Sequence, residues 1–100
     1  MKEDLLKIIN NYGVSNQLKK MSEEVFELQE AIIYAEYNRV LGISNEPCVE
    51  AVKHIAEEIS DCYVILEQFR HHYGISDEEI KKVMKYKINR QLERMEKNEK

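Results

Sequence analysis

Apolar residues recur at intervals of three and four along most of the chain, which is the spacing of one face of an α-helix. The pattern predicts a short helix at residues 2–11, a long helix from about residue 15 to Val40, a third from about Pro47 to His72 or Tyr73, and a fourth from Ser76 to about Lys97. Residues 1–100 are therefore expected to form one all-α domain, a four-helix bundle-like arrangement of one short helix and three longer ones.

Small and polar residues mark the expected helix ends. Gly13 suits a left-handed cap after the first helix, and Ser15 or Asn16 is suited to cap the second. Residues 41–46 are expected to form a loop, because they contain Gly and Ser-Asn breakers, and Pro47 then occupies the first turn of the third helix.

The fourth helix has the clearest start. Gly74 ends the third helix, and Ser76 and Glu79 have the spacing of a capping box. The expected core positions of this last helix are Ile80, Met84, Ile88, Gln91 or Leu92, and Met95.

The long second helix is apolar on two faces. Its main face is formed by Leu18, Met21, Val25, Leu28 and Ile32. A weaker strip of Phe26, Ile33 and Tyr37 lies about 130° away. A bundle of this size has difficulty covering both faces, so the second strip indicates self-association.

Two pairs of acidic residues accompany the core faces of the second and third helices. Glu24 and Glu27 lie about 70° and 130° from the apolar direction of their helix, and Glu58 and Asp61 lie about 60° and 120° from theirs, on the same side. Carboxylates beside a core are costly unless something positive balances them. Oxygen ligands without His or Cys favour hard cations such as Mg²⁺, which also binds phosphates.

The ordinary explanation of two Glu residues on a helix is a solvated face, and the matched offsets of the two pairs weigh against it. Glu23, Glu30 and Glu57 point outward, and Glu36 has no acidic partner, so geometry alone gives these four no ligand role. A di-iron bundle would need Glu-x-x-His on two helices, and none of the three histidines follows a Glu at that spacing.

A basic strip of Lys87, Arg90 and Arg94 runs beside the core face of the fourth helix. Such residues can serve as helix-end cations that favour the helix dipole, or as clamps on phosphate oxygens. The sequence leaves both roles open.

The overall composition, with 43% hydrophobic and 34% charged residues, is that of a globular chain. The net charge of −4 argues against a general nucleic-acid binder or a binder of acidic membranes. No apolar run has the length of a signal peptide or a membrane span. Cys48 and Cys62 lack the spacing of a zinc site or a disulfide framework, so reduced thiols in a cytoplasmic protein are expected.

The arrangement Glu23-Glu24-x-x-Glu27, a connecting loop, Glu58-x-x-Asp61, and then Lys87-x-x-Arg90 resembles the MazG-like group of all-α nucleoside triphosphate pyrophosphohydrolases. The resemblance extends over about residues 15–95, and the segment between the acid pairs is long for the family.

The resemblance implies Mg²⁺-dependent hydrolysis, with Mn²⁺ as an alternative ion, of a nucleoside or deoxynucleoside triphosphate to the monophosphate and pyrophosphate. It makes Glu24, Glu27, Glu58 and Asp61 the metal ligands, Glu23 an additional catalytic acid that orients water, and Lys87 and Arg90 the contacts to substrate phosphates. It also implies a homodimer or homotetramer.

Two other functions fit the same residues. One is a non-catalytic helical interaction or regulatory protein that keeps a metal-binding bundle, and the other is a cation-binding bundle without nucleotide chemistry. Pyrophosphate release from a panel of nucleotides, with and without Mg²⁺, separates both from the enzyme.

Overall fold

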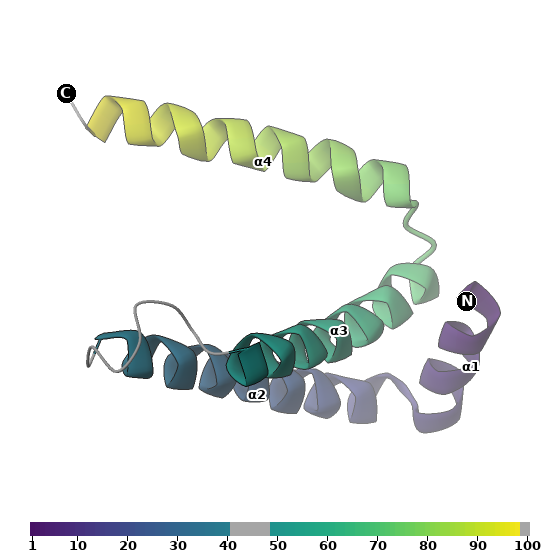
Figure 1. The fold of residues 1–100 in the computed structure, drawn as a ribbon. Helices are drawn as coiled ribbons and strands as arrows, with labels where there is room; N and C mark the ends of the chain where they lie inside the picture. The colour runs from purple at the N-terminus through teal and green to yellow at the C-terminus, as the bar shows by residue number, and fades with distance from the viewer. Residues whose placement is uncertain (41–48, 99–100) are drawn as a thin grey trace.

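The computed structural model describes residues 1–40 and 49–98, and all the regular structure in these two ranges is helical (Figure 1). The helices are α1 (Lys2–Tyr12), α2 (Val14–Val40), α3 (Val49–His72) and α4 (Asp77–Asn98). The predicted all-α, bundle-like fold with one short and three longer helices is confirmed. The predicted loop at residues 41–46, the placement of Pro47 and the state of Cys48 lie outside the described residues.

α1 joins α2 at a single sharp corner. Gly13 has φ 89° and ψ 152°, so its φ is positive as predicted while its ψ is extended instead of left-handed helical. The amide of Gly13 donates to the carbonyl of Ile9 at 2.8 Å, and its own carbonyl accepts from the amide of Gln17 at 3.1 Å. The predicted cap at Ser15 or Asn16 was wrong, because α2 begins at Val14, so that Gly13 occupies the N-cap position and both predicted residues lie within the first turn.

α3 ends in a Schellman motif, the hydrogen-bonded turn that closes many helices at a glycine. Gly74 has φ 66°. Its amide donates to the carbonyl of His71 at 3.1 Å, and the amide of Ile75 donates to the carbonyl of Arg70 at 3.0 Å. The hydroxyl of Ser76 then accepts from the amide of Glu79 at 3.1 Å, which confirms the predicted Ser76 cap of α4.

The core lies where α1, α2 and α3 pack together. Its buried apolar residues are mostly small: Ile9, Ala31, Ala35, Ala51, Cys62 and Ile65. Alanines at the contact let the backbones of α2 and α3 approach closely, so the side chains between them are well shielded from water.

The face of α2 that packs on α3 is not the predicted one. Leu18, Val25 and Ile32 are exposed, whereas Gln17, Glu24 and Ala31 are buried. These buried residues follow one another at intervals of seven, and so do Ala51, Glu58 and Ile65 on α3. We call these two lines of residues together the seam. The predicted core direction of α2 was therefore wrong by roughly 70°, which is the angle at which Glu24 was expected to lie from it. Glu24 lies within the contact between the two helices.

α4 extends from the corner at Gly74 and stands apart from the other helices (Figure 1). Within residues 1–40 and 49–98, its backbone does not come close to that of α1, α2 or α3. The positions predicted as its core are exposed for the same reason, among them Ile80, Met84, Ile88, Leu92 and Met95. A helix that could cross a membrane does not occur among the described residues.

Candidate metal centre

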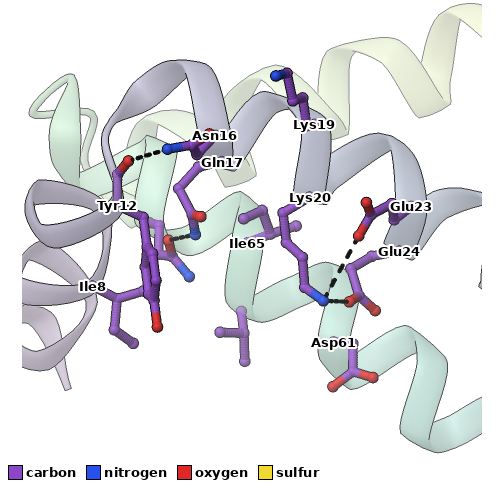
Figure 2. Close-up of a pocket in the computed structure, with 12 residues that line it drawn as sticks. Ile8, Tyr12, Asn16, Gln17, Lys19, Lys20, Glu23, Glu24, Asp61 and Ile65 are labelled. Carbon is purple, nitrogen blue, oxygen red and sulfur yellow. Dashed lines mark hydrogen bonds and ion pairs between the residues drawn. The ribbon is translucent and has the colours of Figure 1, made fainter.

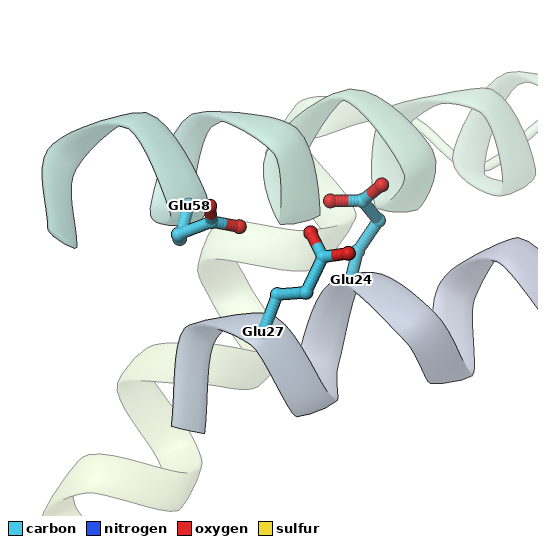
Figure 3. Close-up of side chains that lie close together, drawn as sticks. All are labelled: Glu24, Glu27 and Glu58. Carbon is cyan, nitrogen blue, oxygen red and sulfur yellow. The ribbon is translucent and has the colours of Figure 1, made fainter. Parts of the chain in front are cut away.

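Three of the predicted ligands, Glu24, Glu27 and Glu58, meet between α2 and α3 (Figure 3). One carboxylate oxygen from each lies within 4.8 Å of the other two. We call these three residues the triad. Helix geometry explains the meeting: Glu24 and Glu58 occupy equivalent places in the seam, and Glu27 is almost one turn beyond Glu24 on the same side of α2.

Two oxygens of the triad are buried without a hydrogen-bond partner within the described residues, namely Oε2 of Glu24 and Oε2 of Glu58. Glu24 is 6% exposed and Glu58 is 9% exposed. A buried carboxylate oxygen with no donor is unfavourable, and such groups in native proteins are paired or bind a metal ion. A cation between the helices would satisfy both of these oxygens.

The environment of Glu58 opposes its negative charge. Burial raises the pKa of its carboxyl above the usual value, and the nearby carboxylates of Glu27, Asp61 and Glu24 raise it further. His54 acts in the opposite direction, with its Nε2 at 3.8 Å from Oε1 of Glu58. A divalent ion at the triad would reverse this balance, because it favours the ionised form.

The same surroundings act on a thiol. Burial raises the pKa of Cys62, and the charges of Glu24 and Asp61 raise it further. A raised pKa favours the neutral thiol over the thiolate that binds metals, and the ligand set of the triad consists of carboxylate oxygens only.

Lys20 is a charged neighbour of the triad that the sequence analysis missed. Its Nζ lies 3.0 Å from Oε1 of Glu24 and 3.9 Å from Oε2 of Glu23. Hydrogen bonding to Glu24 raises the pKa of Lys20. The signal was present in the sequence, since Lys20 and Glu24 are four apart and so share a helix face.

A cavity of about 620 Å³ adjoins the triad and is lined by α1, α2 and α3 (Figure 2). Asp61, the fourth predicted ligand, lies at its wall near Glu24 and is exposed to solvent. Glu23 also lines the cavity, beside Lys20. The structure thus brings three of the four predicted ligands together and places Asp61 and Glu23 at the edge of the adjoining cavity.

A buried pair of amides, which was not predicted from the sequence, lines the same cavity. Nε2 of Gln17 donates to Oε1 of Gln68 at 2.7 Å, and both residues are buried. The pair links α2 to α3 across the seam, and it places polar groups in a cavity wall that also includes Tyr12 and Ile65.

The predicted phosphate contacts, Lys87 and Arg90, are both on α4. Neither forms an ion pair with any residue in the part of the chain that the structure describes. Because α4 stands apart from α2 and α3, a single chain does not bring these two side chains to the triad.

The chemistry of the triad fits a hard divalent cation. Three carboxylates from two helices offer oxygen ligands, and the exposed Glu27 leaves one side of the group open to water or to a substrate. No protein-family model matches the chain, and comparisons with curated proteins and with solved structures find no match.

Proposed function

We propose that the protein hydrolyses a nucleoside or deoxynucleoside triphosphate to the monophosphate and pyrophosphate, with Mg²⁺ held by Glu24, Glu27 and Glu58. The observation that carries this proposal is the pair of buried carboxylate oxygens, one on each helix, that have no partner. The proposed reaction is inferred from the order of the acidic and basic residues along the chain, which resembles that of MazG-like enzymes.

Each part of the site has a distinct task in this proposal. When bound, Mg²⁺ supplies positive charge that offsets the phosphate charge and lowers the pKa of an attacking water. The carboxylates of the triad hold the ion, and an acid at the edge of the cavity, Asp61 or Glu23, accepts a proton. The cavity beside Glu24 provides the space for the nucleotide.

The test is pyrophosphate release from a panel of ribonucleotides and deoxyribonucleotides, with and without Mg²⁺. Glu58→Gln keeps the shape of the side chain and removes its charge. Because the variant would bind the metal ion poorly, we expect kcat/KM to fall by about 100-fold or more. Glu57→Gln, on the exposed neighbouring residue, is the matched control and should retain activity.

Circular dichroism keeps this comparison interpretable, because both variants should show the helical spectrum of the original chain. Release of pyrophosphate at an unchanged rate by Glu58→Gln would remove the triad from the reaction. A chain that releases no pyrophosphate from any nucleotide, under conditions in which Mg²⁺ binds, would overturn the proposal.

A second function is favoured by the position of α4. Because Lys87 and Arg90 lie away from the triad in one chain, the same residues suit a cation-binding helical protein that regulates a partner without turnover. This function gives metal-dependent melting without any nucleotide product, so the nucleotide panel separates it from the enzyme.

A further inference from the structure

The cavity beside the triad has two adjacent lysines in its wall. Among the residues that line it, Lys19 and Lys20 are the basic ones. Figure 2 shows the amine of Lys20 directed toward Glu24 and Asp61, whereas Lys19 extends away from these acids. Within the described residues, Lys20 forms two ion pairs and Lys19 forms none. Lys20 is therefore the cation at the end of the cavity that adjoins the triad.

Lys20 contacts one oxygen of Glu24 and leaves the other free. Its Nζ lies 3.0 Å from Oε1 of Glu24. Oε2 of the same carboxylate is one of the two buried oxygens without a hydrogen-bond partner in the part of the chain that the structure describes. The carboxylate thus has a separate oxygen for each of two positive partners, so Lys20 need not leave when a metal ion binds.

The amine of Lys20 is free to reach a further partner. The side chain of Lys20 is 53% exposed, whereas that of Glu24 is 8% exposed. An ion pair with one exposed member constrains that member only weakly, and a lysine amine has three donors on a flexible stem. Lys20 can therefore keep its contact with Glu24 and also donate to an anionic group in the cavity.

The cavity wall changes from charged to uncharged along α2. Gln17 lies seven residues before Glu24, which corresponds to about 10 Å along the helix. The wall there is formed by the amide pair of Gln17 and Gln68 and by Tyr12, all of which are uncharged. A ligand with phosphates at one end and an uncharged polar group at the other fits this division, with its phosphates next to Lys20.

The basic residues expected to contact phosphates lie elsewhere. Lys87 and Arg90 are on α4, and within residues 1–40 and 49–98 this helix does not approach α2 or α3. Lys20 is on the same helix as Glu24 and Glu27, so its distance from the triad is fixed by the geometry of one helix. In a single chain, Lys20 is the lysine in position to meet a ligand at the triad.

We propose that Lys20 is a substrate-binding residue whose amine donates to the oxygens of a phosphate chain at the triad end of the cavity. This role rests on the proposed function, because it names a contact to the substrate of that reaction. It gives Lys20 the task that the resemblance gives to Lys87 and Arg90. Without Lys20, this end of the cavity would present mainly the carboxylates of Glu23, Glu24 and Asp61, which repel phosphates.

Inorganic tripolyphosphate tests this contact, because it has the phosphate chain of a nucleotide without base or sugar. Isothermal titration calorimetry of the full chain in Mg²⁺ measures its affinity. Lys20→Met should weaken binding about 10-fold or more, since it removes a charge-assisted hydrogen bond, and Lys20→Arg should retain most of the affinity. Lys19→Met removes the same charge one residue away and is the matched control, with an expected change of less than about twofold.

Binding of Mn²⁺ separates a lost phosphate contact from a lost metal site. Electron paramagnetic resonance of the free ion measures this binding without phosphate and without turnover. Lys20→Met should bind Mn²⁺ at least as tightly as the original chain, because a positive charge next to Glu24 has been removed. A large loss of Mn²⁺ affinity would mean that Lys20 acts by holding Glu24 in place, and the phosphate contact would be overturned.

Circular dichroism shows whether each variant is folded, and Lys20→Gln replaces Lys20→Met if the latter loses its helices. Tripolyphosphate that binds Lys20→Met as it binds the original chain would overturn the contact. So would an original chain that binds no tripolyphosphate, or a loss of binding in Lys87→Met that Lys20→Met does not share.

Failure of this contact and failure of the proposed reaction give different results. If nucleotides are hydrolysed with an unchanged KM by Lys20→Met, the reaction stands and the role of Lys20 falls. If no nucleotide is hydrolysed while tripolyphosphate binding still depends on Lys20, the phosphate contact stands and the proposed reaction falls.

Discussion

At the residue scale, the most informative side chain is Glu58, an acid placed where the seam of a helix pair ordinarily has an apolar residue. It is 9% exposed, its Oε2 has no partner within the described residues, and two other carboxylates of the triad face it. In the absence of a cation, all of these features oppose its ionisation. The site is therefore arranged at a cost to the metal-free protein, which a bound cation would relieve.

Glu58→Gln should raise the melting temperature of the metal-free protein, and it should abolish any further rise that added Mg²⁺ or Mn²⁺ causes in the original chain if the proposed site binds these ions. The raised pKa of Glu58 sets the pH dependence. A carboxyl whose pKa is higher in the folded state destabilises that state when ionised, so the penalty is complete above the raised pKa and is relieved as the pH falls toward the unfolded value of 4.5.

The difference in melting temperature between Glu58→Gln and the original chain should therefore be largest near neutral pH and should vanish below pH 4.5. Differential scanning fluorimetry in EDTA measures this difference, with Glu57→Gln as the control that shows none. A variant that melts below the original chain at neutral pH would mean that the charge of Glu58 has a favourable partner.

At the scale of the helix, the sequence predicted which segments are helical and how α4 begins, because those properties depend on neighbouring residues. It did not predict which face of α2 is buried. The apolar residues Leu18, Val25 and Ile32 outweigh Glu24 in any count of hydrophobicity, yet the small side chains of Ala31 and Ala35 decide where α3 packs closely. The spacing of the acidic residues was enough to find the acid pairs. The separation of α4 from the triad could not be predicted in this way, because it depends on the corner at Gly74.

Ala31→Leu should lower the free energy of unfolding by about 1–3 kcal/mol, because a larger side chain in the seam forces α2 and α3 apart. Urea denaturation followed by circular dichroism measures the change. If the proposed site binds a metal ion, the separation of the helices should also weaken stabilisation by that ion, since the carboxylates of the triad come from both helices.

Ala56→Leu is the matched control, since Ala56 lies on α3 but is exposed to solvent, and its stability should change by less than about 0.5 kcal/mol. Equal stability of the two leucine variants would contradict the close contact of α2 and α3 at Ala31.

At the scale of the whole molecule, the three packed helices and the separate α4 divide the chain into a body and an arm. The body contains the triad, the adjoining cavity and the buried apolar residues, and the arm contains the basic strip and an uncovered apolar face. The self-association predicted from the second apolar strip of α2 agrees with this exposure, since Phe26, Ile33 and Tyr37 are each at least 60% exposed. Association of two copies remains a prediction.

If association supplies much of the stability, the melting temperature should rise with protein concentration, because dilution favours separated chains by mass action. Scanning calorimetry at several concentrations measures this dependence. A melting temperature that is the same at every concentration in the original chain would show that one chain is stable alone.

The seven-residue spacing of the seam determines which mutations α2 can accept during evolution. Inserting or deleting one residue between Gln17 and Ala31 would turn everything beyond it by about 100° around the axis of α2. Many single replacements on the outer surface would leave the triad in place, but a change of one residue in length would carry Glu24 or its neighbours out of the contact. Descendants of this sequence are therefore free to vary in composition along α2 and strictly limited in its length.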